Sequence, residues 1–166
     1  MDNINNNYIK LVRVWLTICS LSIFCMIVLG GATRVTDSGL SMVAWEPLKI
    51  LPPISNAEWS LEFSRYQKFP EFKIINSWMQ IEDFKQIFWL EYIHRLWGRV
   101  IGLIFIVPFF WFIFKKIITG PLMWKLWATL ALGGAQGLMG WFMVASGLVN
   151  RPDVSQYRLA AHLALA

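Results

Sequence analysis

The stretch that decides the fold is FWLEYIHRLWGRVIGLIFIVPFFWFIF, residues 88–114. A helix of about 20 apolar residues crosses the hydrocarbon core of a bilayer, and this run exceeds that length. Its first three turns nevertheless carry Glu91, His94, Arg95 and Arg99. The run therefore predicts a membrane-spanning helix with a polar constellation near one end.

Three more apolar stretches flank this run, over 14–32, about 124–149 and 157–166. The first two are long enough to span a bilayer. The third reaches the end of the sequence after about 15 Å of helix, which is half a membrane. We expect it to be a truncated fourth helix of a transmembrane bundle, and we interpret the sequence as part of a longer chain.

The composition supports the membrane assignment. Of the 166 residues, 57% are hydrophobic and 15% are charged, and the mean hydropathy is +0.50. Soluble domains contain about 45–50% apolar and about 25% charged residues, and disordered chains are more polar still. The net charge of +5 is explained by the basic residues that set membrane topology, so no nucleic-acid partner is predicted. We predict one all-α integral membrane domain over residues 1–166.

Basic residues near the span ends predict the orientation. Lys10 and Arg13 precede the first span, and Lys115 and Lys116 follow the second in a short connection without acids. The segment 33–87 mixes both signs of charge and can therefore be translocated. The positive-inside rule then predicts a cytoplasmic N-terminus and an external segment over 33–87.

The external segment is too aromatic for a flexible linker, so we expect it to fold against the membrane face. Ser55 to Glu58 is typical of an N-cap, which predicts a short helix over 58–66. Cys19 and Cys25 lie six residues apart in the first apolar run. A helix places them on different sides, so no disulfide or metal thiolate site is predicted.

The polar residues of the second span share one helix face. Glu91, His94 and Arg95 follow the spacing i, i+3, i+4, and Gly98 and Gly102 continue the same stripe. Ionised side chains cost about 2.5–3.5 kcal/mol each at mid-membrane, so this stripe is not expected to face lipid. An ion-pair belt at the interface, with Glu91 paired to Arg95, remains an equal alternative at this point.

The second histidine of the chain favours a haem site. The chain has two histidines, His94 and His162. In an alternating topology each lies about one and a half turns into its span from the outer side. Helices two and four of a four-helix bundle are diagonal neighbours, so the imidazoles would face each other across the core. This arrangement favours bis-histidine ligation of haem iron over zinc, which lacks further ligands here.

Small and basic residues fit the same hypothesis. Gly133, Gly137 and Gly140 allow close helix packing or leave room for a flat macrocycle. Arginines expected near the outer surface could pair with haem propionates, or extend to lipid headgroups. They are Arg34, Arg95, Arg99, Arg151 and Arg158.

Several motifs resemble one family. They are Gly30-Gly31-Ala32-Thr33-Arg34-Val35-Thr36, then Ser38-Gly39-Leu40-Ser41-Met42 with Trp45 and Pro47, then Glu91-Tyr92-Ile93-His94-Arg95 with Gly98-Arg99, and Ala161-His162-Leu163. The combination is similar to haem A synthase and covers nearly the whole chain. Because the external segment has no cysteine, it resembles the branch without a cysteine pair there.

The resemblance implies a fold and an activity. Family members have eight transmembrane helices in two pseudo-symmetric four-helix halves. The N-terminal half holds haem O as substrate, and the C-terminal half holds a haem b that handles electrons. The enzyme oxidises a ring methyl of haem O to a formyl group, giving haem A. By this resemblance His94 and His162 are axial ligands of the haem iron, Glu91 is the catalytic residue, and Arg95, Arg99 and Arg34 position the propionates.

The resemblance also implies a location and partners. The expected location is the bacterial inner membrane, or the mitochondrial inner membrane in a eukaryote, and the expected partners are haem O, haem A, the lipid bilayer and haem O synthase. Because half of the family's fold is absent from this sequence, we do not expect the chain alone to complete the reaction. Two alternatives stay open: a b-type haem electron carrier and a non-catalytic membrane interaction module.

Overall fold

A computed structural model describes residues 2–44, 51–150 and 154–166 of the chain. Within these residues all regular secondary structure is helical. The elements are α1 (Asp2–Val35), α2 (Asn56–Tyr66), α3 (Pro70–Ile74), α4 (Ile81–Phe114), α5 (Pro121–Asn150) and α6 (Gln156–Leu165). The prediction of an all-α fold is confirmed.

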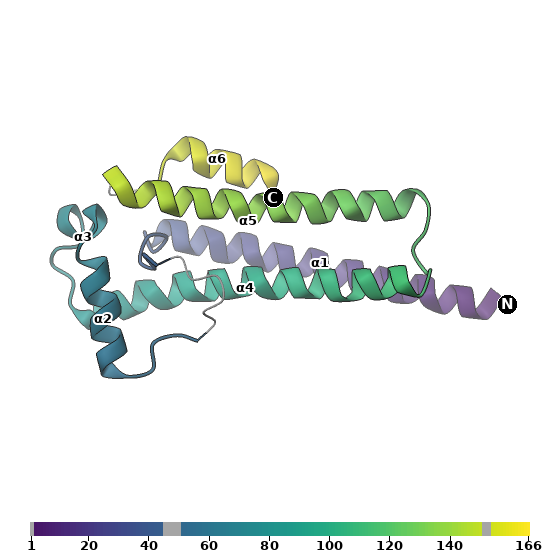
Figure 1. Cartoon of the computed structure of the whole chain (residues 1–166), viewed down its shortest axis with the longest axis horizontal. Coiled ribbons are helices and arrows are strands. Elements are labelled where there is room, and N and C mark those ends of the chain that lie inside the picture. The colour runs from purple at the N-terminus through teal and green to yellow at the C-terminus, as the bar shows by residue number, and fades with distance from the viewer. Residues whose placement is uncertain (1, 45–50, 151–153) are drawn as a thin grey trace.

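The four membrane-directed helices run side by side with alternating direction (Figure 1). α1 packs mainly against α4, and α6 packs mainly against α5, whereas α4 and α5 make fewer contacts with each other. The bundle therefore consists of two helical hairpins, α1 with α4 and α5 with α6. α2 and α3 lie together at the end of the bundle where α4 begins (Figure 1).

Three of these helices are long and apolar enough to cross a membrane among the described residues, over Asn6–Val35, Ile81–Phe114 and Pro121–Gly147. The chain is therefore a multi-pass membrane protein. The helices extend beyond the apolar runs from which they were predicted, because the backbone continues its hydrogen-bonding pattern into polar flanks. α4 begins seven residues before residue 88, and α6 begins one residue before 157.

A proline in α4 explains one contact between α1 and α4. Pro108 has no N–H to donate to the carbonyl of Ile104, one turn earlier in the helix. The indole N–H of Trp15 on α1 donates to that carbonyl instead, at 2.8 Å. Trp15 is 5% exposed and lies among apolar side chains of both helices. Since a free carbonyl is costly in lipid, this bond favours the observed pairing of α1 and α4.

A second indole bond lies one heptad away along both helices. Trp97 Nε1 of α4 donates to the carbonyl of Ser22 on α1 at 3.0 Å. The steps from Trp15 to Ser22 and from Ile104 to Trp97 are equal in length and opposite in direction. The two bonds together fix the antiparallel register of α1 and α4.

The segment between α1 and α4 folds around aromatic side chains, as expected from its composition. α2 has a complete capping box between Ser55 and Glu58 and begins at Asn56, two residues before the predicted start. Its buried residues Trp59 and Tyr66 pack on the first turns of α4. The remaining core members are Phe84, Ile87, Phe88 and Tyr92. α3 was not predicted, because five residues are too few to show a helical periodicity.

Both cysteines are free, and Cys19 is buried while Cys25 is exposed. Neither thiol is bonded to the other in the structure. The cytoplasmic position of the N-terminus stays a prediction.

Candidate functional site

His94 lies on the face of α4 that packs against α1. A Cβ atom placed on Gly30 of α1 would lie 3.5 Å from His94 Nε2. The imidazole is half-buried, and no hydrogen bond to it is found within the described residues. α1 thus offers a small residue where the ring approaches, and the ring nitrogen keeps its capacity for a ligand.

His162 has a similar environment in the other hairpin. A Cβ on Gly140 of α5 would lie 3.3 Å from His162 Cε1. One turn earlier, Gln136 Nε2 lies 3.3 Å from His162 Nε2. Gln136 Oε1 and His162 Nδ1 are buried without a hydrogen-bond partner in the described part of the chain. Buried polar groups are usually satisfied, so these two atoms keep unused hydrogen-bonding capacity beside the His162 ring.

The two histidines come from separate hairpins, His94 from that of α1 and α4 and His162 from that of α5 and α6. Imidazoles suit haem iron as ligands, and His162 would take that role once its Nε2 is released from Gln136 Nε2. No group of three or more His, Cys, Asp or Glu side chains that could hold a bare metal ion occurs among the described residues. Ligation of one iron by both histidines stays a prediction.

Glu91 lies one turn before His94, and its carboxylate is fully engaged. The residue is 2% exposed. Its Oε2 accepts from Ser41 Oγ and from the backbone N–H of Met42, both at 2.7 Å. Its Oε1 accepts from Arg95 Nη2 at 2.5 Å. The Glu91–Arg95 pair expected of the ion-pair alternative is therefore present, and the catalytic role of Glu91 stays a prediction.

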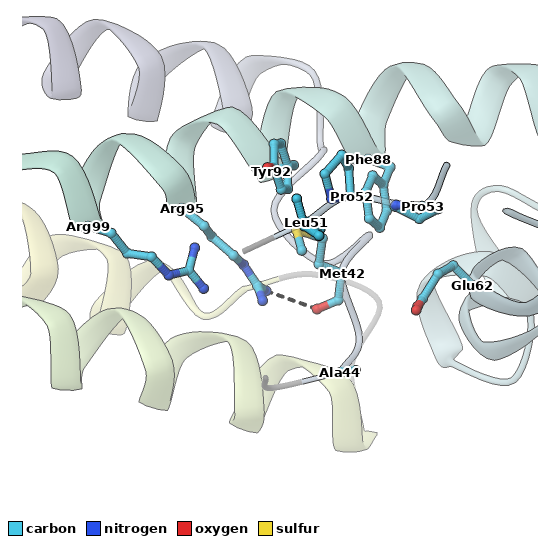
Figure 2. A pocket seen from close by; sticks show the side chains of 10 residues that line it. All are labelled: Met42, Ala44, Leu51, Pro52, Pro53, Glu62, Phe88, Tyr92, Arg95 and Arg99. Atoms are coloured by element: carbon cyan, nitrogen blue, oxygen red, sulfur yellow. Dashed lines mark hydrogen bonds between the residues drawn. The ribbon is translucent and has the colours of Figure 1, made fainter. Parts of the chain in front are cut away.

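Arg95 continues the same network. Its Nη2 also donates to the carbonyl of Met42 at 2.9 Å (Figure 2). Figure 2 shows the guanidinium groups of Arg95 and Arg99 extending from α4 toward the same side. Both line a pocket between α4 and the segment that joins α1 to α4, together with Met42, Ala44, Leu51, Pro52, Pro53, Glu62, Phe88 and Tyr92. The pocket volume is about 30 Å³, room for one or two waters, so the porphyrin ring itself does not fit there.

Arg34 and Arg158 do not line this pocket. Arg34 is half-exposed and pairs with Asp37 at 3.0 Å. Arg158 lies over the ring of Phe142, 4.8 Å from its centroid. Arg151, Trp45 and Pro47 lie outside the described residues. The structure brings Arg95 and Arg99 together but not Arg34, whose positioning role stays a prediction.

The glycines differ in what a side chain at each position would contact. A Cβ on Gly98 would lie 3.0 Å from the end of Met26, so this glycine allows close packing of α1 and α4. Gly102, Gly133 and Gly137 face open space in the described structure. Gly137 also lines a shallow hollow on α5 with Gly134, Leu138 and Trp141. Among the described contacts, Gly30 and Gly140 are the glycines that lie beside the two histidines.

Besides Glu91 and Glu62, a third acid is buried, and its burial in the segment between α1 and α4 was missed from the sequence. Glu71 on α3 is buried, and its Oε2 has no hydrogen-bond partner in the described structure. Burial and the nearby charge of Glu91 raise the pKa of Glu71 to about 8. Burial also raises the pKa of Tyr66, whose hydroxyl accepts from Asn76 Nδ2 at 2.8 Å. Nothing in the local sequence distinguishes Glu71 from the exposed acids around it.

Ser41 and Gln136 were also missed as site residues. Ser41 falls within a motif that carries the resemblance, but its contact with Glu91 joins residues 50 positions apart. Gln136 could have been found, because it is a polar residue in an apolar span and lies one turn before Gly140.

These features define a class: a multi-pass helical membrane protein with one histidine on each of two hairpins and a pocket lined by two arginines of α4. Comparison with known proteins gives the family. The chain belongs to the family described as cytochrome oxidase assembly protein, whose sequence model matches residues 13–166.

Curated relatives agree with this assignment. The chain is 52% identical to a protein named heme A synthase from Nitrosospira multiformis, over 95% of the chain and 44% of the relative. It is also 52% identical to a heme A synthase from Paramagnetospirillum magneticum, over 93% of the chain and 44% of the relative. A heme A synthase from Rhizobium etli is 51% identical, over 95% and 43%. The chain thus spans less than half the length of these relatives. No solved structure matches it.

Proposed function

We propose that this chain forms the substrate half of an enzyme that oxidises a ring methyl group of haem O to the formyl group of haem A. The observation that carries the proposal is that His94 and His162 lie on separate hairpins, each beside a glycine of the neighbouring helix. The names of the relatives support the same activity. In this proposal the two imidazoles bind the iron of haem O.

The proposed roles of the other residues follow from their positions. Arg95 and Arg99 line one pocket at the outer end of the bundle, where carboxylates of a bound haem could pair with them. Glu91 is proposed to accept a proton during the oxidation. Its two oxygens already receive three donors, so this role requires the release of at least one of them.

The reaction also needs an electron acceptor. Conversion of a methyl to a formyl group takes up the oxygen of one water and releases four protons and four electrons. We propose that a haem b outside this chain receives the electrons. We further propose an inner-membrane location with a cytoplasmic N-terminus, and delivery of haem O by haem O synthase in the same bilayer.

Haem extraction and chromatography test the function. The chain is expressed in a haem O-producing host as part of an enzyme that includes the four further helices implied by the resemblance. The parent should convert haem O to haem A, and His94→Ala and His162→Ala should abolish conversion. Glu91→Gln should retain haem O and make little haem A.

The outcomes separate the proposals. A parent that binds haem but makes no haem A would favour an electron carrier and refute the enzyme. Undiminished haem A from Glu91→Gln would leave that carboxylate a structural role only.

A further inference from the structure

The carboxylate of Glu91 and the guanidinium of Arg95 bind both backbone polar groups of one residue. Glu91 Oε2 accepts from the Met42 N–H, and Arg95 Nη2 donates to the Met42 carbonyl. The two side chains lie at i and i+4 on α4 and are themselves paired. The backbone at Met42 is therefore held by a closed ring of bonds that does not depend on the side chain of Met42.

Ser41 completes this ring from the neighbouring position. Its hydroxyl is buried and lies 2.7 Å from Glu91 Oε2. The carbonyl oxygens of Ser38 and Ile87 lie farther from the Ser41 hydroxyl oxygen, at 3.0 and 3.3 Å. A hydroxyl has one proton to donate, and the charged acceptor at the shortest distance gives the strongest bond. Ser41 therefore donates to Glu91.

The ring determines where Arg95 points. Both hydrogen bonds of Arg95 within the described residues use Nη2. A guanidinium has five N–H donors in a rigid plane, so fixing one nitrogen from two sides also fixes the direction of the rest. Arg95 lines the pocket beside Arg99, and its remaining donors are available to an anion there.

We propose that Ser41 is a positioning residue: by holding the Glu91 carboxylate, it fixes the guanidinium of Arg95 at the pocket, ready to bind a carboxylate of the porphyrin substrate. This inference rests on the proposed function. It assigns Glu91 a role in organising the site that is separate from any proton transfer, and it gives the external segment a part in substrate binding.

Two porphyrin probes test the inference with the 166-residue chain in lipid nanodiscs. The probes are ferric protoporphyrin IX, which has two free propionates, and its dimethyl ester, which has none. Binding is measured by optical titration. The parent should bind the free acid more tightly than the ester. Ser41→Ala should weaken binding of the free acid about tenfold and leave binding of the ester unchanged.

Matched variants separate positioning from general damage. Ser64→Ala removes an exposed hydroxyl of α2 that donates to the Leu61 carbonyl and should bind as the parent does. Ser41→Thr keeps the hydroxyl and should retain the preference for the free acid. Arg95→Gln should lose that preference, and adding Ser41→Ala to it should cause no further loss, because both act on one contact. If Ser41→Ala does not fold, retention by Ser41→Thr and loss by Arg95→Gln still test the ring.

The failures are distinguishable. Equal weakening of both probes by Ser41→Ala, or no weakening of either, overturns the positioning role while leaving the haem site intact. A parent that binds neither probe, or that binds them as well after His94→Ala and His162→Ala, overturns the proposed haem site and this inference with it.

Discussion

The bond between Trp15 and the Ile104 carbonyl gives the sharpest test of the bundle. Pro108 cannot supply the N–H that Ile104 would receive in a regular helix, and Trp15 supplies it at 2.8 Å. Trp15→Phe removes the donor and leaves a buried carbonyl without a partner. An unsatisfied buried group costs about 1–3 kcal/mol, in addition to the packing lost with the smaller ring.

A double-mutant cycle isolates the hydrogen bond from the packing. Pro108→Ala restores an N–H to α4, so the Ile104 carbonyl then has an intrahelical partner. Trp15→Phe should therefore cost about 1–2 kcal/mol less in the Pro108→Ala background than in the parent, because only the packing loss remains. The free energy of unfolding is measured in mixed detergent micelles by circular dichroism. A coupling energy within about 0.5 kcal/mol of zero would refute the reasoning.

Three further predictions follow from other features. Burial raises the pKa of Glu71 to about 8, so the folded state holds a proton that the unfolded state releases near the ordinary value. The free energy of unfolding should therefore fall as pH rises toward 8, and Glu71→Gln should remove that dependence in pH-dependent melting. Gly140→Ala should shift the optical spectrum of bound haem more than Gly30→Ala, because its Cβ would lie 3.3 Å rather than 3.5 Å from an imidazole; equal shifts would contradict this. Ser55→Ala should break the cap of α2 and cost about 1 kcal/mol, seen as faster amide hydrogen exchange in its first turn; unchanged exchange would show that tertiary packing holds that turn.

The sequence allowed the membrane helices to be predicted, because length and hydropathy alone decide whether a run can cross a bilayer. It was less informative about helix ends: α1 begins at Asp2 rather than near residue 14, since polar residues continue a helix outside lipid. That His94 and His162 face each other, which was inferred from their depth and the alternating direction of the helices, stays a prediction.

Some contacts of Glu91 could be predicted from the sequence and others could not. The spacing to Arg95 predicted their pairing, and that pair is present. The bonds from Ser41 and Met42 could not be predicted, because they depend on how a segment without helical periodicity returns to α4. The burial of Glu71 was missed for the same reason: it results from the packing of α3, not from the residues next to it.

The division of the bundle into two hairpins has a thermodynamic consequence. His94 belongs to the hairpin of α1 and α4, and His162 to that of α5 and α6, while α4 and α5 make fewer contacts with each other. Under the proposed ligation, an iron bound to both imidazoles is a cross-link between the hairpins. A ligand that binds only the assembled state stabilises it by mass action, by about 2.7 kcal/mol at a hundredfold excess over its dissociation constant. By the same linkage, strain that separates the two hairpins lowers the affinity for the porphyrin. Under the proposed ligation, separation of the hairpins would therefore release the bound porphyrin.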